Sequence, residues 1–213
     1  MLRLSHLARL AVLPLFLLGG CADTPRLAGN TFRTLSDTPL GVNVSYDFDY
    51  LGEASYTVPN KTVSDAWLFR NTHHAYPGEY LQVHHVKELS AYETGPGDVV
   101  NLGRKQYKSQ MFCVAWSGEG IAQMEHGDEL LPYMDFLHRY VDASRYAMIR
   151  RFIPQRRDDD DHDRVDIVFI EDMVRYGFDC KPFVDPGAPE GDAAKDYMAS
   201  FKIRSLRAFE IIR

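Results

Sequence analysis

The feature that most constrains the fold is a run of nine residues, Val42 to Tyr50, in which large apolar and small polar residues alternate. Val42, Val44, Tyr46, Phe48 and Tyr50 would lie on one side of an extended chain, with polar residues between them. This alternation of aromatic and β-branched residues is typical of a half-buried β-strand with one solvated face. We therefore predict a strand here and a sheet that buries one of its faces.

Further stretches with strand character follow along the chain. Pro77-Gly78 separates two of them, which predicts a hairpin with a loose loop, because this pair does not suit the tight turns of two-residue hairpins. Near the end, Phe201, Ile203, Phe209 and Ile211 recur at even spacings and predict a last strand. The further strands expected are 55–58, 65–74, 79–89, 106–116, 146–153, 164–171 and 200–212, with loops over 90–103 and 177–192.

One helix is expected, from about 128 to 142. Leu130, Met134, Leu137 and Val141 recur there at the spacing of a helix that buries one stripe. Strands outnumber helices, and no repeated strand–helix–strand rhythm is present. The pattern favours an α+β fold in which an antiparallel β-sheet carries this one main packed helix.

The first 21 residues have the layout of a secretory signal. Arg3 and Arg9 precede an apolar run of nine residues, Leu10 to Leu18, and Gly19-Gly20-Cys21 closes it. Nine residues are too few for a permanent membrane span, which needs about 20 in a helix.

Leu18-Gly19-Gly20-Cys21 resembles the lipobox of bacterial lipoproteins. The resemblance implies that residues 1–20 are a signal peptide, that Cys21 receives a lipid through its thiol, and that the protein is anchored to a membrane. In lipoproteins of this type an Asp directly after the cysteine favours the inner membrane. Ala22 stands at that position, so the resemblance implies the outer membrane, with the protein facing the periplasm.

Behind the signal, residues 21–40 are expected to form the lipidated N-terminus and a flexible tether, because they hold few large apolar residues. Residues 41–213 are expected to form one globular domain. The signal holds two of the 24 Lys and Arg residues and none of the 30 acidic residues, so the mature chain has a net charge of 22 minus 30, or −8. Such a charge disfavours nucleic acid as a partner.

Besides Cys21, the chain holds two cysteines, Cys113 and Cys180. An even pair in an exported chain predicts a disulfide, because the compartments outside the cytosol are oxidising. A catalytic thiol at Cys113, paired with a histidine, is the alternative.

Two histidine pairs, His73-His74 and His84-His85, lie on the two strands of the predicted hairpin. With Pro77-Gly78 at its centre, His73 would lie diagonal to His84 and about 7–8 Å away, with His74 and His85 on the other face. Imidazoles bind Zn, Cu or Ni, but such a site needs three or four ligands, and no third residue has a diagnostic spacing. A metal site is therefore an alternative, and the lipid on Cys21 is the only covalent group expected.

Catalytic motifs give no assignment. The acidic run over 158–163 lacks the glycine of a calcium loop and is interpreted as a solvated hairpin tip. Ser117 is not part of a G-x-S-x-G turn, and no phosphate-binding or dinucleotide motif is present. No catalytic residue is proposed from the sequence.

Aromatic residues around the predicted hairpin form a candidate binding surface for sugars or for a partner protein: Trp67, Tyr76, Tyr80 and Tyr92. Together with the anchor, this favours a non-enzymatic lipoprotein that binds or supports another component of the cell envelope, such as an envelope protein. The alternative function is a periplasmic hydrolase or metal-binding protein that uses the histidine hairpin.

Overall fold

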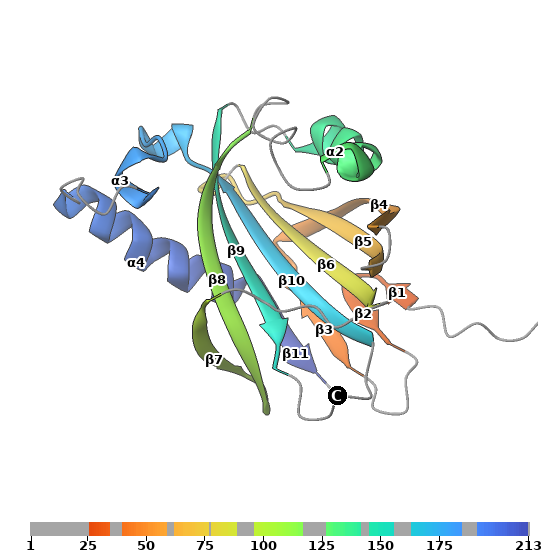
Figure 1. Ribbon diagram of the computed structural model, residues 1–213. Coiled ribbons are helices and arrows are strands. Elements are labelled where there is room, and N and C mark those ends of the chain that lie inside the picture. The colour runs from red at the N-terminus through yellow and green to blue at the C-terminus, as the bar shows by residue number, and fades with distance from the viewer. Residues whose placement is uncertain are drawn as a thin grey trace, which may run out of the picture.

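The computed structural model describes residues 26–34, 40–58, 62–76, 78–88, 96–116, 127–141, 145–155, 163–184 and 191–212. They form two antiparallel sheets (Figure 1): a small one of order β1-β2-β3-β11 and a large one of order β4-β5-β6-β10-β9-β8-β7. The strands are β1 (Arg26–Ala28), β2 (Thr31–Arg33), β3 (Gly41–Val44), β4 (Phe48–Val58), β5 (Thr62–Asn71), β6 (Glu79–Glu88), β7 (Asp98–Leu102), β8 (Lys105–Ala115), β9 (Tyr146–Pro154), β10 (Asp163–Asp172) and β11 (Phe209–Ile212). The helices are α2 (Gly127–Tyr140), the short η1 (Val174–Tyr176) and α3 (Lys181–Val184), and α4 (Asp192–Arg207).

The protein is mostly β, so the predicted α+β fold with one main packed helix is wrong. The expected helix is present as α2, but α4 is longer and occupies residues 200–207 of the expected last strand, so that strand is present only as β11. The buried residues of α4, Ala194, Tyr197, Phe201 and Ser205, follow the helical period of three to four. The even spacing of Phe201 and Ile203 was misleading, because Ile203 is about half exposed on the outer side of the helix.

The alternating run from Val42 to Tyr50 is not one strand but the corner between the two sheets. β3 ends at Val44, β4 begins at Phe48, and the residues between them form a turn in which the Phe48 amide donates to the Ser45 carbonyl. The Asn30 side chain stabilises this corner by donating to the carbonyls of Ser45 and Phe48, at 3.2 and 2.7 Å. The predicted single strand is therefore wrong: alternation indicated extended chain on either side of the turn, but it carried no information about where the chain changes sheet.

The predicted hairpin over residues 65–89 is present as β5 and β6, but its register differs. Leu68, and not His73, lies opposite Gln82, because β5 ends at Asn71 and a longer connection follows. The expected loop at 90–103 contains β7, which pairs with β8 through a turn where Gly103 has a positive φ of 60°.

The small sheet also includes residues that were expected to lie in the tether. β1 and β2 pair with each other, β2 pairs with β3, and Phe32 is fully buried. Residues 26–33 therefore belong to the fold and not to a tether, because this short hairpin packs Leu27 and Phe32 against the core. Residues 21–25 lie outside the described part of the chain.

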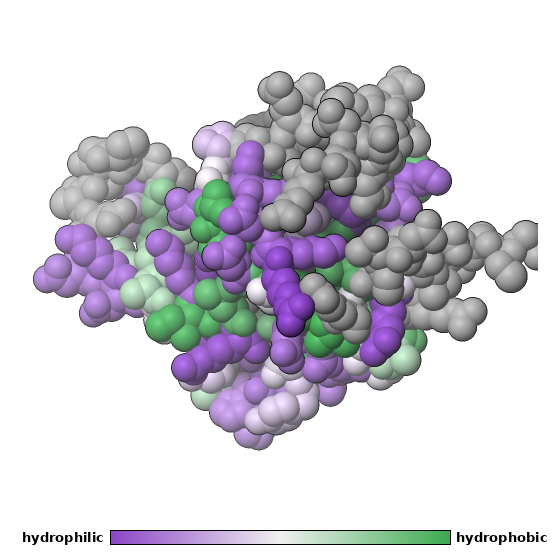
Figure 2. All heavy atoms as spheres, turned by 90° about the horizontal axis from the view of Figure 1, so that it is seen from below, coloured by the Kyte–Doolittle hydropathy of each residue, from purple (hydrophilic) through white to green (hydrophobic). Residues whose placement is uncertain are grey.

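Both faces of the large sheet are covered, and each side has its own apolar core. One core packs the sheet against α4 and the small sheet and includes Phe32, Phe169 and Phe201. The other packs the opposite face against α2 and includes Leu137 and Ile170. Figure 1 shows α2 and α4 well apart from each other around the large sheet. Seen from below, the described surface is mainly hydrophilic, with small separate apolar areas (Figure 2).

Cys113 and Cys180 form a disulfide, as the sequence predicted, with their Cα atoms 5.4 Å apart. The bond joins β8, near the edge of the large sheet, to the segment between η1 and α3. The two cysteines are 67 residues apart in sequence, so the bond closes a long loop in the unfolded chain.

We predict that replacing both cysteines by serine lowers the free energy of unfolding by about 4 kcal/mol, because the unfolded chain regains the entropy of that loop. Urea unfolding of the chain from Ala22 onward measures the change. Reduction of the unaltered protein should give a similar loss, and a change below about 1 kcal/mol would show that the disulfide contributes little.

Candidate ligand-binding pocket

A pocket of about 400 Å³ lies between α2 and the large sheet. Strand alternation brings apolar side chains of β8, β9 and β10 to this face, and α2 adds residues from one side of the helix. The volume falls in the range of about 300–1,000 Å³ that is typical of small-molecule sites. The apolar wall includes Val114, Trp116, Leu137, Ile149, Val168 and Ile170.

Polar side chains meet at one part of this pocket. Gln82 and His84 come from β6, Tyr56 from β4 and Tyr133 from α2. Gln82 Oε1 accepts hydrogen bonds from the Tyr133 hydroxyl and from His84 Nε2, the latter at 2.8 Å. His84 Nδ1 lies 3.2 Å from the Tyr56 hydroxyl. Three elements that are distant in sequence therefore meet at the amide of Gln82.

Burial fixes the protonation of this group. His84 is enclosed, and desolvation lowers its pKa to about 4, so the imidazole is neutral at neutral pH. Burial likewise raises the pKa of Tyr133 well above its usual value and raises that of Tyr56, so both phenols keep their protons. Hydroxyl protons and one ring N–H are thus the donors within the group.

A charged group lies beside the neutral one. Asp166 of β10 is opposite His84 in the strand ladder, and its carboxylate accepts from Arg151 and from Arg164, the latter at 2.8 Å. Burial alone would raise the pKa of Asp166, but the two guanidinium groups outweigh it and hold the pKa below its usual value. Arg151 also lines the pocket, so this wall has a cationic side chain.

A second buried polar cluster lies on the opposite face of the sheet, against α4. The Glu171 carboxylate accepts from Tyr197 at 2.8 Å and from Arg204 at 3.0 and 2.8 Å, and it also accepts from Tyr176. Glu79 is its neighbour across the strand ladder and lies 2.9 Å from Arg204 Nε. Burial, together with the charge of Glu171, raises the pKa of Glu79 to about 7. This cluster joins α4 to the sheet and is closed to solvent, since both carboxyl groups are almost fully buried.

The histidines proposed as metal ligands do not come together. His73 and His74 are exposed in the β5–β6 connection, where the His73 ring lies against Tyr76. His84 faces α2, whereas His85 faces the other side of the sheet, 3.9 Å from Asp163. Within the described ranges, no three His, Cys, Asp or Glu side chains are grouped closely enough to hold a metal ion.

The aromatic residues proposed as a binding surface are also separated. Trp67 is buried in the core under α4, Tyr80 is buried in the core under α2, and Tyr76 is exposed in the connection between their strands. Tyr92 lies outside the described residues, as do Cys21, Ser117 and residues 158–161 of the acidic run.

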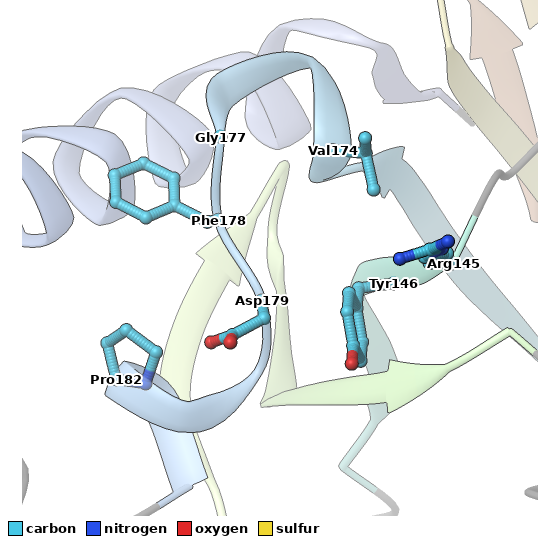
Figure 3. Close-up of a pocket in the computed structure, with 7 residues that line it drawn as sticks. All are labelled: Arg145, Tyr146, Val174, Gly177, Phe178, Asp179 and Pro182. Atoms are coloured by element: carbon cyan, nitrogen blue, oxygen red, sulfur yellow. The ribbon is translucent and has the colours of Figure 1, made fainter.

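A second depression, of about 360 Å³, is lined by residues on both sides of Cys180 in the sequence. Figure 3 shows the residues that line it. Arg145 and Tyr146 at the start of β9 face the segment from Val174 to Pro182 there. Arg145 and Asp179 are exposed, and no buried polar group is among its lining residues. The pocket under α2 is the better candidate site because it combines enclosure with a built polar group.

Sequence reasoning identified His84 but not the residues that act with it. Gln82 and His84 stand at alternate positions of a strand whose other buried residues on that face, Tyr80 and Val86, are mainly apolar, and this was the available signal. Tyr56 and Tyr133 carried none, because only the packing of β4 and α2 brings them to β6.

Comparison of the chain with protein-family models, with curated proteins and with solved structures gives no match in any of the three. Among the described helices, none combines the length and the hydropathy that crossing a bilayer requires.

The Glu79 carboxyl predicts a pH dependence of stability. The folded protein keeps a proton on Glu79 up to about pH 7, whereas the unfolded chain releases it near 4.5. This contribution to stability is complete below pH 4.5 and is lost as the pH rises through 7. In Glu79→Gln, the loss of unfolding free energy between pH 5 and pH 8 should be smaller than in the unaltered protein by about 1–3 kcal/mol.

Urea unfolding at the two pH values measures this difference. Glu210→Gln, at an exposed position of β11, is the matched control and should behave like the unaltered protein. An equal pH dependence in Glu79→Gln and in the unaltered protein would contradict the assignment.

Proposed function

We propose that this protein is a lipid-anchored binding protein of the cell envelope that holds a small, mainly apolar ligand in the pocket under α2. The observation that carries the proposal is a space of about 400 Å³ with apolar walls on both the sheet side and the helix side. Protein interiors are otherwise packed as densely as organic crystals. A space of this size, with a few convergent polar groups, is typical of a ligand site.

Two observations favour binding over catalysis. The His84 ring has partners at both nitrogens, and Asp166 is paired with two guanidinium groups, so neither group is free to act as a base. The alternative of a hydrolase or metalloprotein on the histidine hairpin depended on a register that β5 and β6 do not have.

The anchor supports the same proposal. If Cys21 carries a lipid, five residue steps separate it from Arg26, where β1 begins. Even a fully extended chain of that length spans at most about 17 Å. The small sheet would then stay close to the bilayer, where apolar ligands are concentrated.

Cys21→Ser should abolish the anchor. We expect this variant to take up no radiolabelled palmitate and to leave the lipid-linked membrane fraction, because the attacking thiolate is missing. Ala22→Asp is the matched control: it should keep the label but move from outer-membrane to inner-membrane fractions. Full labelling of Cys21→Ser would overturn the lipoprotein assignment.

Filling the pocket should abolish ligand binding. Val168 lies on the pocket wall, and Val168→Phe adds a ring to the space that the ligand would occupy. Titration with N-phenyl-1-naphthylamine, an apolar fluorescent probe, measures binding to the chain from Ala22 onward, which contains every described residue. We expect an affinity at least about tenfold lower than that of the unaltered protein, which corresponds to about 1.4 kcal/mol.

Val63→Phe, at an exposed position of β5, is the control and should bind the probe normally. If the unaltered protein binds no probe, or if Val168→Phe binds it as tightly, the pocket is not a ligand site.

A further inference from the structure

The amide of Gln82 has a hydrogen-bonding capacity that the protein does not use. Its oxygen accepts two hydrogen bonds, from Tyr133 and from His84. Its nitrogen, Nε2, has two N–H groups and no partner among the described residues. The side chain is 1% exposed and lines the pocket, so bulk water does not satisfy these donors. A buried donor without an acceptor is destabilising, and native proteins rarely leave one in place.

The surrounding network fixes which way the amide points. A phenol is a much stronger acid than a neutral imidazole N–H, so the Tyr56 hydroxyl donates to His84 Nδ1. A neutral imidazole that accepts at Nδ1 carries its proton on Nε2 and must donate from there. The group facing His84 Nε2 is therefore the oxygen of Gln82, and the NH₂ group is the one without a partner.

The residues directly opposite Gln82 offer no acceptor side chain, and the nearby Asp166 carboxylate of β10 already accepts from two arginine side chains. Gln82 is flanked across the ladder by Leu68 of β5 and Val168 of β10, and both side chains are apolar. The pocket is thus the remaining source of an acceptor for these two N–H groups.

On this basis, and resting on the proposed function, we propose that the ligand is a single-chain fatty acyl compound whose carbonyl or carboxylate oxygen accepts from Gln82 Nε2. The apolar walls suit the hydrocarbon chain, because only one part of the pocket offers polar partners. A volume of about 400 Å³ is near the lower end of the range for small-molecule sites, which suits one chain better than a two-chain lipid.

The same wall disfavours other classes of ligand. An ammonium group brings only donors to a place that already has unpaired donors, and it would approach the Arg151 guanidinium. A sugar would bury several hydroxyl groups against apolar side chains without partners. A ligand with an oxygen acceptor at the end of an apolar chain avoids both problems, because it supplies the missing acceptor and buries no unpaired hydroxyl group.

The test compares three ligands that differ only in the head group: dodecanoate, methyl dodecanoate and dodecylamine. The assay measures how well each ligand displaces N-phenyl-1-naphthylamine from the chain that begins at Ala22. We expect dodecylamine to bind at least about tenfold more weakly than dodecanoate. Binding of both dodecanoate and its ester identifies the carbonyl as sufficient, as in an esterified lipid, and binding of dodecanoate alone identifies a free fatty acid.

A variant at Gln82 tests the class of ligand separately from the ability of the pocket to bind an apolar molecule. Gln82→Met keeps the length of the side chain but removes the amide, that is, the N–H donors and also the oxygen that accepts from Tyr133 and His84. Dodecanoate should therefore bind about five- to tenfold more weakly. N-phenyl-1-naphthylamine carries no carbonyl and should bind this variant as it binds the unaltered protein, which also shows that the variant is folded. Gln106→Met, at an exposed position of β8, is the matched control and should change neither affinity.

The outcomes distinguish the two proposals. If N-phenyl-1-naphthylamine does not bind the unaltered protein, the proposed function fails. If it binds, but dodecylamine competes as well as dodecanoate or Gln82→Met leaves dodecanoate affinity unchanged, the pocket stands and the acyl assignment is overturned.

Discussion

The constraint on which the structure depends is the burial of the large sheet on both faces. Its central strand, β10, is buried at every position after Asp163, so each of its side chains must find a partner in one of two cores. Apolar residues do so by packing. Two of its three buried acids, Asp166 and Glu171, do so through arginines, on opposite faces of the strand. A strand of this kind can lie only inside a sheet that is covered from both sides.

The elements that pack on the two faces of the large sheet differ in extent, and this difference produces the pocket. The α4 side is closed by a long helix and by the small sheet, whose Phe32 and Phe209 reach the core. Among the described residues, the α2 side is covered by one helix of 14 residues, which packs mainly near β4, as the contact of the Phe136 ring with the Gly52 region illustrates. One short helix does not cover the face of seven strands. The space that remains lies towards β8 and β9, where Val114 and Ile149 face it.

Local sequence patterns predicted the features of the fold that depend on residues close together in the sequence. They predicted the strand that is present as β8, and the hairpin of β5 and β6. Register and sheet change depend on contacts between distant residues, such as the Asn30 side chain that holds the corner before Phe48. The same limit applied to the site: β6 displayed Gln82 and His84, but Tyr133 meets them only after α2 has docked.

The two buried polar clusters can be compared as candidate sites, because each lies on one face of the same strands. Around Glu171, two phenols and a guanidinium donate to the carboxylate, and the proton kept by Glu79 suits its place beside a second acid. Its charges pair within the protein, and Glu79 Oε1, which makes no hydrogen bond to a described residue, lies 2.9 Å from Arg204 Nε, so the cluster holds α4 in place. Around Gln82, the donors outnumber the acceptors, and the surplus faces an apolar space. A cluster whose charges are paired within the protein indicates a structural role. A cluster with more donors than acceptors indicates that its ligand must supply an acceptor.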